Sequence, residues 1–280
     1  MKKIKSYAAA TSDSLLEPFE IIRRECSDYD VYITIEYCGV CHSDIHMARN
    51  EWGGSTIYPI VPGHEIIGVV NKVGSKVKKF KIGDDVGVGV YVDSCGQCYN
   101  CKNNLDHYCE KGIVLTYNSY EYGTKTITYG GYSKAIVVNQ DYVVKIPKGM
   151  DKEKSAPLLC AGITTYSPLK YFKIGSHHKV GIAGLGGLGH MGLKFAVSFG
   201  ANVTVFSTSE SKRKEALLLG AHSFVNVKNK EESKEALNSC HYILDTVSSN
   251  RNMSELFSWL RTDGLIMTVG LPTEPHKISG

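Results

Sequence analysis

The 280-residue sequence has little excess charge of either sign and no long hydrophobic run. Its 32 Lys and Arg residues stand against 28 Asp and Glu residues, a net charge of +4, so the charge balance gives no reason to expect nucleic-acid binding. No apolar stretch approaches the roughly 18 residues that a membrane helix needs. Apolar residues still make up 42% of the chain, which excludes a disordered tail protein. The expected partner is a small-molecule substrate, with no nucleic acid and no membrane.

The N-terminus lacks the pattern of a secretory signal. Lysines are frequent at its start, but the apolar stretch at 7–10 is too short and leads into polar residues at 11–13. Nine cysteines without an export signal indicate metal ligands or free thiols rather than disulfides. We therefore expect a cytoplasmic protein.

The length suggests two domains, at a prior of roughly 150 residues each. In residues 1–150, strict alternation at 31–37 and further extended runs at 66–73 and 135–146 predict an antiparallel β domain. In residues 151–280, a helix at 155–172 precedes alternating strands and helices, which predicts an α/β domain with a doubly wound parallel sheet. The expected strands are 180–183, 203–207, 224–227, 242–245 and 265–269, with helices at 187–199 and 211–219. Five strands are one fewer than the full dinucleotide-binding fold has.

Four cysteines share one loop segment at metal-ligand spacing. Cys95, Cys98, Cys101 and Cys109 form C-x2-C-x2-C-x7-C among Gly and Asn residues, where thiols have little apolar core to join. Four thiolates suit the closed tetrahedral shell of a structural Zn²⁺. An iron-sulfur cluster uses similar ligands, and unliganded loop thiols are the third alternative.

A second group of metal-ligand residue types is spread along the chain. Cys41 and His46 bracket the stretch Cys41-His42-Ser43-Asp44-Ile45-His46, and His64 lies in Gly63-His64-Glu65. Cys160 lies in a further apolar segment, 157–162. From spacing alone a common metal site competes with an ordinary surface histidine and a packed apolar thiol.

A glycine-rich motif follows the expected strand at 180–183. Gly184, Gly186, Gly187, Leu188 and Gly189 give G-x-G-x-x-G at the start of a helix, the context in which this motif indicates dinucleotide binding. Glycines there permit a tight turn and a close approach of the backbone to the pyrophosphate at the helix N-terminus.

The end of the next strand selects the cofactor. It reads Ser207, Thr208, Ser209 with no carboxylate, and Lys212 and Arg213 follow. Hydroxyls and a lysine favour the 2′-phosphate of NADP(H), whereas Glu210 works against it. The alternative for Lys212 and Arg213 is a solvated helix face.

Several of these motifs, in this order, resemble the medium-chain dehydrogenase/reductase family. Gly63-His64-Glu65 with Gly68, Gly74 and Val77 is similar to the zinc alcohol dehydrogenase signature. Residues 41–46, 157–162 and 183–190 are most similar to the cinnamyl alcohol dehydrogenase branch. The resemblance covers about residues 25–271. It implies a GroES-like zinc-binding catalytic domain at 1–150 and an incomplete NADP-binding Rossmann domain at 151–280.

The resemblance also implies roles for individual residues. A catalytic Zn²⁺ would be bound by Cys41, His64 and Cys160, with an open fourth position. Asp44 would orient His64, with a helix cap as the alternative, and Glu65 would lie beside the metal. The proton relay and pyrophosphate contact implied are Ser43, His46 and His42, where the alternative for His46 is an ordinary surface histidine.

The resulting hypothesis is an NADP(H)-dependent zinc alcohol dehydrogenase that reduces aromatic or medium-chain aldehydes, with Trp52 and Tyr117 as candidate aromatic walls. A polyol dehydrogenase is the rival, although that branch generally has a carboxylate where this chain has Cys160. Family members continue beyond the length of this chain and form homodimers. The alternative hypothesis is therefore a C-terminally truncated, catalytically impaired fragment that binds zinc and nucleotide.

Overall fold

A computed structural model describes residues 2–251, 253–276 and 278. The chain divides into two compact units, Met1–Cys160 and Ala161–Gly280. The boundary between the units lies between Cys160 and Ala161, whereas the change in sequence pattern lies near residue 150.

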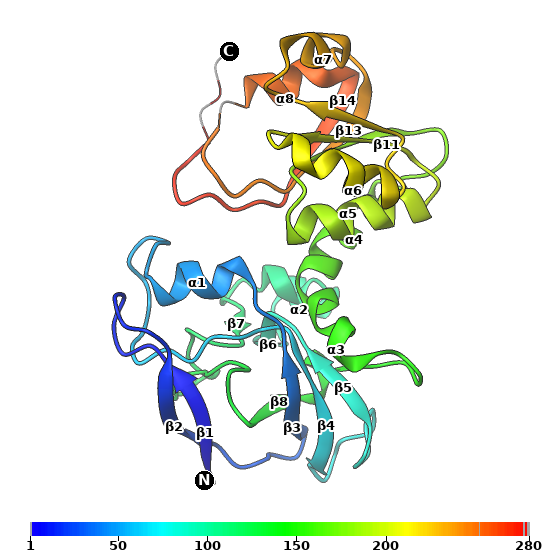
Figure 1. Cartoon of the computed structure of the whole chain (residues 1–280). Helices are drawn as coiled ribbons and strands as arrows, with labels where there is room; N and C mark the ends of the chain where they lie inside the picture. Colours follow the sequence, from blue (N-terminus) through cyan, green and yellow to red (C-terminus); the bar gives the residue numbers. More distant parts are fainter. Residues whose placement is uncertain (1, 252, 277, 279–280) are drawn as a thin grey trace. The chain divides into compact units, whose positions relative to one another are not determined.

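The first unit is built from antiparallel sheets (Figure 1). A five-stranded sheet has the order β8-β3-β4-β5-β9, and two strand pairs, β1-β2 and β6-β7, accompany it. The strands are β1 (Lys2–Ala8), β2 (Glu17–Arg23), β3 (Asp30–Cys38), β4 (Ile66–Val73), β5 (Asp85–Val88), β6 (Tyr91–Asp93), β7 (Val114–Leu115), β8 (Ala135–Asn139) and β9 (Val144–Lys145). The helical segments are α1 (His42–Ala48), α2 (Tyr99–Lys102), η1 (Asp106–Tyr108), η2 (Gln140–Tyr142), α3 (Lys152–Ser155) and η3 (Ala156–Leu159).

The alternation at 31–35 produces the core of this unit. The same pattern is wrong for Tyr37, which is exposed because the β3–β4 register shifts between Ile35 and Tyr37. Val31, Ile33 and Ile35 point to the buried side of β3 and pack with apolar residues of β4, β5 and β8, as the period-2 pattern predicts. The single run expected at 135–146 is wrong. β8 ends at Asn139, whose side chain accepts the Asp141 N–H and starts the 3-10 turn η2 before β9 begins.

The second unit contains the predicted parallel sheet, which confirms the predicted fold class. The order β12-β11-β10-β13-β14 has all neighbours parallel. The strands are β10 (Lys179–Ala183), β11 (Asn202–Ser207), β12 (Ser223–Asn226), β13 (Cys240–Asp245) and β14 (Leu260–Thr268). The helical segments are α4 (Ala161–Tyr171), α5 (Gly187–Ser198), η4 (Glu210–Lys212), α6 (Arg213–Leu218), α7 (Lys230–Glu235) and α8 (Ser254–Trp259).

Helices cover both faces of this sheet (Figure 1). Residues of α4, α5 and α6 pack on one face, including Leu169, Leu193 and Ala216. Leu256 and Trp259 of α8 pack on the other, where Trp259 stacks on Phe206 with ring centroids 4.1 Å apart. Both faces are therefore buried, as expected for a doubly wound sheet.

The single helix expected at 155–172 is wrong, because the structure interrupts it at Cys160. Pro157 has no N–H to donate, so the segment 156–159 forms the 3-10 turn η3, and Cys160 follows it with φ −127° and ψ −77°. A regular helix resumes only at Ala161. The interruption places the Cys160 side chain in the first unit.

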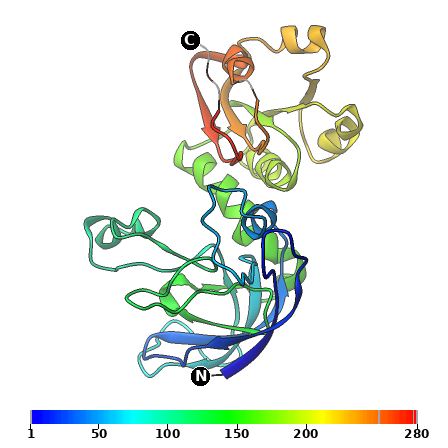
Figure 2. The ribbon, with the colours of Figure 1, turned by 90° about the vertical axis from the view of Figure 1, so that its left-hand side faces the viewer.

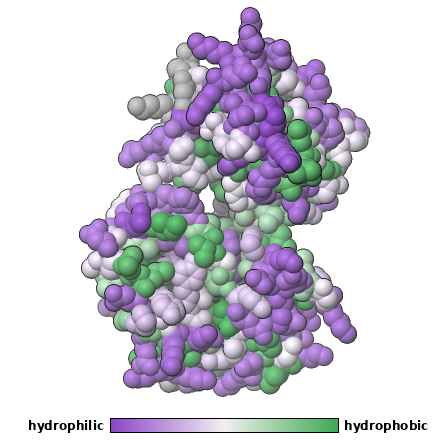
Figure 3. Space-filling model, viewed as in Figure 1, coloured by the Kyte–Doolittle hydropathy of each residue, from purple (hydrophilic) through white to green (hydrophobic). Residues whose placement is uncertain are grey.

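The surface carries both hydrophobic and hydrophilic residues. On the face shown in Figure 3, hydrophobic residues lie in separate spots among hydrophilic ones in each unit. Among the described residues, no helix combines the length and the hydropathy that a bilayer crossing requires.

Candidate metal and cofactor sites

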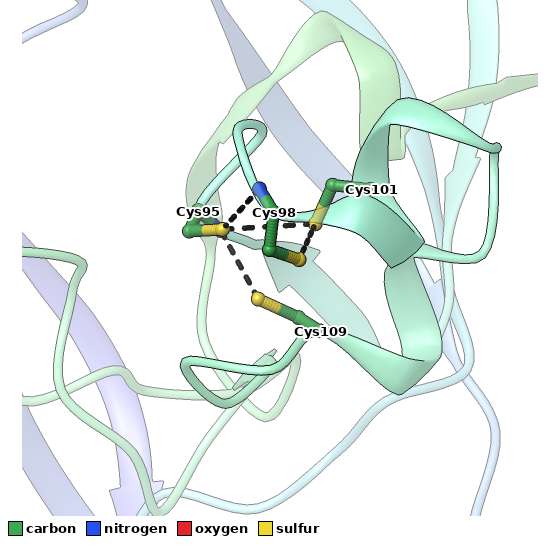
Figure 4. A group of neighbouring side chains, drawn as sticks. All are labelled: Cys95, Cys98, Cys101 and Cys109. Atoms are coloured by element: carbon green, nitrogen blue, oxygen red, sulfur yellow. Dashed lines mark hydrogen bonds between the residues drawn. The ribbon is translucent and has the colours of Figure 1, made fainter.

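The four cysteines predicted as a metal site lie together in the first unit. Their segment projects from the body of that unit (Figure 2), and the four side chains converge (Figure 4). All four sulfur atoms lie within 4.8 Å of one another. Cys95 Sγ is 3.8 Å and Cys98 Sγ 3.4 Å from Cys101 Sγ, close to the spacing of about 3.8 Å that four sulfurs have around a tetrahedral Zn²⁺.

Backbone N–H groups near these sulfurs stabilise the thiolate form, which is the form that binds a cation. Gly96 takes a left-handed φ of +63°, and the turn it makes aims the N–H groups of Gln97 and Cys98 at Cys95 Sγ, at 3.5 and 3.3 Å. These two N–H groups lower the pKa of Cys95 to about 6. The Ser94 hydroxyl favours a Cys101 thiolate, but burial and the nearby Cys98 sulfur outweigh it and raise the pKa of Cys101 to about 12. The cluster therefore cannot ionise fully by itself, and a dication fits it.

A second cluster brings together residues that are far apart in the sequence. One ligand atom each from Cys41, His64, Glu65 and Cys160 lies within 4.8 Å of the others. The sulfur atoms of Cys41 and Cys160 are 3.9 Å apart. The structure thus assembles the three expected ligand residues and adds the Glu65 carboxylate as a fourth group.

Asp44 joins the helix α1 to this cluster. It occupies the third position of α1, where its Oδ2 accepts the Cys41 N–H at 3.0 Å and the Tyr132 hydroxyl at 3.1 Å. Its Oδ1 accepts the Gly63 N–H and lies 3.0 Å from His64 Nδ1. The two sequence-based interpretations of Asp44, a helix cap and a partner of the histidine, therefore hold together. Because Asp44 occupies Nδ1, His64 can present Nε2 to the thiols.

The protonation of the second cluster indicates which ion fits it. The Cys160 thiol lowers the pKa of Cys41 to about 4 despite burial, and the Cys41 thiolate raises that of Cys160. Burial disfavours charge on His64, but Asp44 and Cys41 raise its pKa to about 10. Burial, followed by the charge of Cys41, raises the pKa of Glu65 to about 7. A Zn²⁺ ion would replace the protons of Cys160 and His64, so the donor set fits it.

The residues expected to move a proton lie beside this cluster. Ser43 Oγ is 3.5 Å from Cys41 Sγ. His46 is buried, its ring stacks on His42 at 4.6 Å, and Trp52 lies 5.1 Å from it. An exposed surface histidine is therefore not what the structure has at position 46.

Sequence reasoning missed Glu51 as a partner of His46. Glu51 Oε2 lies 2.5 Å from His46 Nδ1, and His46 Nε2 is buried without a hydrogen-bond partner among the described residues. An acidic residue five positions after a histidine is a weak signal, because it becomes a contact only where the helix ends at Ala48 and the chain turns at Asn50 with φ +59°.

The glycine-rich motif has the geometry that a pyrophosphate needs. Gly184 has φ +87°, and a Cβ on Gly189 would meet the Gly184 carbonyl oxygen at 2.2 Å. At Gly186 and Gly187 a Cβ would have no described atom within 4 Å. The motif is thus closed on its protein side and open where a phosphate would approach the N-terminus of α5.

The 2′-phosphate candidates lie at the end of β11. Ser207 is buried and its Oγ accepts the Ser209 N–H at 3.2 Å, while Thr208 is exposed. Lys212 donates its Nζ to the Leu185 carbonyl oxygen at 2.8 Å, so it lies at the glycine-rich loop rather than on a solvated helix face.

Glu210, the residue that could oppose a 2′-phosphate, is held by other groups. Its carboxylate pairs with Arg213 and accepts from Asn226 Nδ2 at 3.1 Å. Arg213 also pairs with Glu232 at 2.9 Å and lies over Phe224. Both charges are therefore paired with each other and with groups of β12 and α7.

Comparisons with known proteins agree with this architecture. The family model described as "Alcohol dehydrogenase GroES-like domain" matches residues 27–148, and the family model described as "Zinc-binding dehydrogenase" matches residues 187–280. A probable mannitol dehydrogenase of Medicago sativa is 51% identical over 99% of this chain and 77% of its own length.

Solved structures of cinnamyl alcohol dehydrogenases are similar to both units. That of Sorghum bicolor has a TM-score of 0.95 at 43% identity and covers 99% of this chain and 78% of its own. That of Helicobacter pylori, complexed with NADP(H), has a TM-score of 0.91 at 42% identity and covers 97% of this chain and 76% of its own. This chain therefore belongs to the zinc-dependent alcohol dehydrogenases of the medium-chain dehydrogenase/reductase family, in the cinnamyl alcohol dehydrogenase branch.

Proposed function

We propose that this chain interconverts aldehydes and primary alcohols by moving a hydride between NADP(H) and the carbonyl carbon. Residues 1–150 would act as the zinc-binding catalytic domain and residues 151–280 as the cofactor domain. The observation that carries the proposal is the second cluster, where Cys41, His64 and Cys160 converge although the sequence separates them widely. Three such ligands leave a fourth position open to substrate, as in catalytic zinc sites.

The residues around the cluster have separate roles. A bound Zn²⁺ would supply a Lewis acid that polarises the carbonyl oxygen. Cys41, His64 and Cys160 would hold it, Asp44 would fix the orientation of His64, and Glu65 would stand beside it as a buried carboxyl group. Cys95, Cys98, Cys101 and Cys109 would hold the structural Zn²⁺.

The chain's own side chains offer a path for the proton. Ser43 Oγ lies 3.5 Å from Cys41 Sγ, and its hydroxyl group can both accept and donate a proton. His46 would deliver the proton to solvent, and Glu51 would hold the His46 ring in place through Nδ1.

The second unit would bind the cofactor in two parts. Gly184, Gly186, Gly187, Leu188 and Gly189 would receive the pyrophosphate, and His42 is a further candidate for contact with it. Ser207, Thr208, Ser209 and Lys212 would bind the adenosine 2′-phosphate, because hydroxyl and ammonium donors suit that anion.

Substrate, assembly and compartment are inferred from the aromatic residues near the second cluster, the family resemblance and the cysteine content. Trp52 beside His46 and Tyr117, whose ring lies 5.8 Å from that of His64, favour aromatic or medium-chain aldehydes. A homodimer is proposed from the family resemblance. Nine free cysteines support a reducing, cytoplasmic location.

The test is oxidation of NADPH by the zinc-loaded chain with cinnamaldehyde, octanal and, in the reverse direction, mannitol with NADP⁺. Turnover with the aldehydes is expected. Cys160→Ser should abolish it while the four-cysteine site keeps its zinc, and Cys240→Ser, a buried cysteine of the second unit, is the matched control. Turnover with mannitol only, or normal turnover by Cys160→Ser, would overturn the proposal.

A further inference from the structure

His190 lies in α5, directly after the glycine-rich motif, and bridges two elements of the second unit. Its Nδ1 is 3.1 Å from the carbonyl oxygen of Gly186, and its Nε2 is 3.0 Å from Glu215 Oε1 in α6. Both of these oxygens are acceptors of a ring N–H. The side chains of His190 and Glu215 are 34% and 53% exposed. The bridge is thus accessible and contributes little to the core.

The two elements that His190 joins lie next to the segments that would bind the two anionic parts of the cofactor. Gly186 belongs to the loop that would receive the pyrophosphate. Glu215 belongs to the helix that continues from the segment 207–212, which would bind the 2′-phosphate. A second side chain makes a parallel connection, because Lys212 donates to the Leu185 carbonyl oxygen at 2.8 Å.

The distance between two anion-binding segments matters when one ligand must satisfy both. The pyrophosphate and the 2′-phosphate are attached to the 5′ and 2′ oxygens of one ribose, so their separation varies little. A segment that is not held at the matching distance must be ordered when the cofactor binds, which costs free energy. The end of β11 itself is fixed by the hydrogen bond from the Gly184 N–H to the Phe206 carbonyl oxygen at 2.8 Å. The residues after Ser207 leave the sheet, so their position depends on packing of α6 and on such side-chain bridges.

We propose that His190 and Glu215 are positioning residues that hold the 2′-phosphate-binding segment against the pyrophosphate-binding loop, and that this pair sets the preference for NADP(H) over NAD(H). The inference rests on the proposed function. NAD(H) has no 2′-phosphate, so its binding depends on the pyrophosphate loop without requiring the second segment at that distance.

The experiment compares His190→Phe, Glu215→Leu, Glu215→Gln and the double variant His190→Phe/Glu215→Leu in the zinc-loaded chain. The KM for NADPH should rise about fivefold in each of the first two variants, while the KM for NADH and both kcat values stay within about twofold. The double variant should equal the single variants, because one bridge is lost in each. Glu215→Gln keeps an amide oxygen acceptor and should restore most of the preference.

Glu235→Leu, which removes an exposed carboxylate at the end of α7, is the matched control and should change neither KM. A merely structural role would lower the melting temperature of the cofactor-free variants and raise both KM values together, and this result would overturn the inference. Additive effects in the double variant would overturn it also. A wild-type chain that binds NADPH no better than NADH would instead contradict the proposed function itself.

Discussion

Asp44 Oδ1 lies 3.0 Å from His64 Nδ1, with the two side chains only 3% and 4% exposed. Burial disfavours the charged form of Asp44, but the hydrogen bond from His64 and its charge lower the pKa of Asp44 below its ordinary value of 3.8. The buried carboxylate therefore stays ionised and fixes both the tautomer and the orientation of the histidine.

Asp44→Asn should weaken the catalytic zinc site. The amide removes the negative charge and turns an NH₂ group toward a site surrounded by donors, the N–H groups of Cys41 and Gly63. Loss of such a partner of a metal-bound histidine reduces metal affinity or activity about 10–100-fold. Zinc titration with a competing chelator and kcat/KM for aldehyde reduction would measure the effect. Asp28→Asn, at an exposed ion pair with Lys76, is the control and should behave like the wild type.

Much of the fold follows from local sequence patterns, whereas contacts between distant segments do not. Alternation at 31–35 and the strand-helix repeats after residue 178 are local properties, and the structure confirms them, whereas Tyr37 is exposed. The helix break at Cys160 depends on packing that a helical pattern does not contain. The sequence spacing of Cys41, His64 and Cys160 does not decide whether they share a site, because that depends on how the chain folds. The family resemblance suggested the answer, and Glu51 had no such support.

Cys98→Ser should remove one metal ion and loosen the projecting segment. Cys98 is the N-cap of α2, and its sulfur is 3.4 Å from Cys101 Sγ. The apolar cluster of this lobe consists of the four cysteines themselves. Few other contacts would therefore hold the lobe together without the metal. Zinc binding at such sites contributes on the order of 10 kcal/mol. Zinc content should fall from about two ions per chain to about one, and limited proteolysis should cut within 94–112. Unchanged zinc content would contradict the four-cysteine assignment, and Cys26→Ser is the control.

Glu51→Gln should slow proton transfer without disturbing the zinc. The carboxylate faces His46 Nδ1 at 2.5 Å and holds the ring whose Nε2 has no other partner among the described residues. General acid-base groups contribute about 100- to 10,000-fold, and loss of a group that only orients one should lower kcat by about tenfold. Zinc content and the KM for NADPH should not change. Equal kcat values for Glu51→Gln and the wild type would remove Glu51 from the relay.

Ser207→Asp should shift the cofactor preference toward NADH. A carboxylate at the end of β11 would repel the 2′-phosphate of NADPH and can accept from the free 2′-hydroxyl of NADH. The ratio of kcat/KM for NADPH to that for NADH should fall by at least about tenfold, because like charges placed side by side are strongly unfavourable. Asn202→Asp adds the same charge at the opposite, exposed end of β11 and should leave the ratio unchanged. An unchanged ratio in Ser207→Asp would exclude this strand end from the 2′ position.

The amino-terminal edge of the parallel sheet should be sensitive to acid through His241. His241 Nδ1 accepts the Lys179 N–H at 2.9 Å, and Arg261 Nη1 lies 3.0 Å from its Nε2. Burial, followed by the charges of Arg261, His178 and Lys179, lowers the pKa of His241 below its ordinary value of 6.5.

Because the folded state holds the His241 proton more weakly than the unfolded chain does, protonation favours unfolding. The stabilising contribution of neutral His241 is therefore complete above about pH 6.5, the unfolded value, and is lost as the pH falls through the lower folded value. Urea unfolding can be measured at pH 7.5 and pH 5 with a signal from the second unit such as Trp259 fluorescence. The urea concentration at the unfolding midpoint should fall less between pH 7.5 and pH 5 for His241→Asn than for the wild type. Asparagine keeps an acceptor for the Lys179 N–H but does not titrate, so an equal loss in both proteins would mean that other groups cause the acid sensitivity.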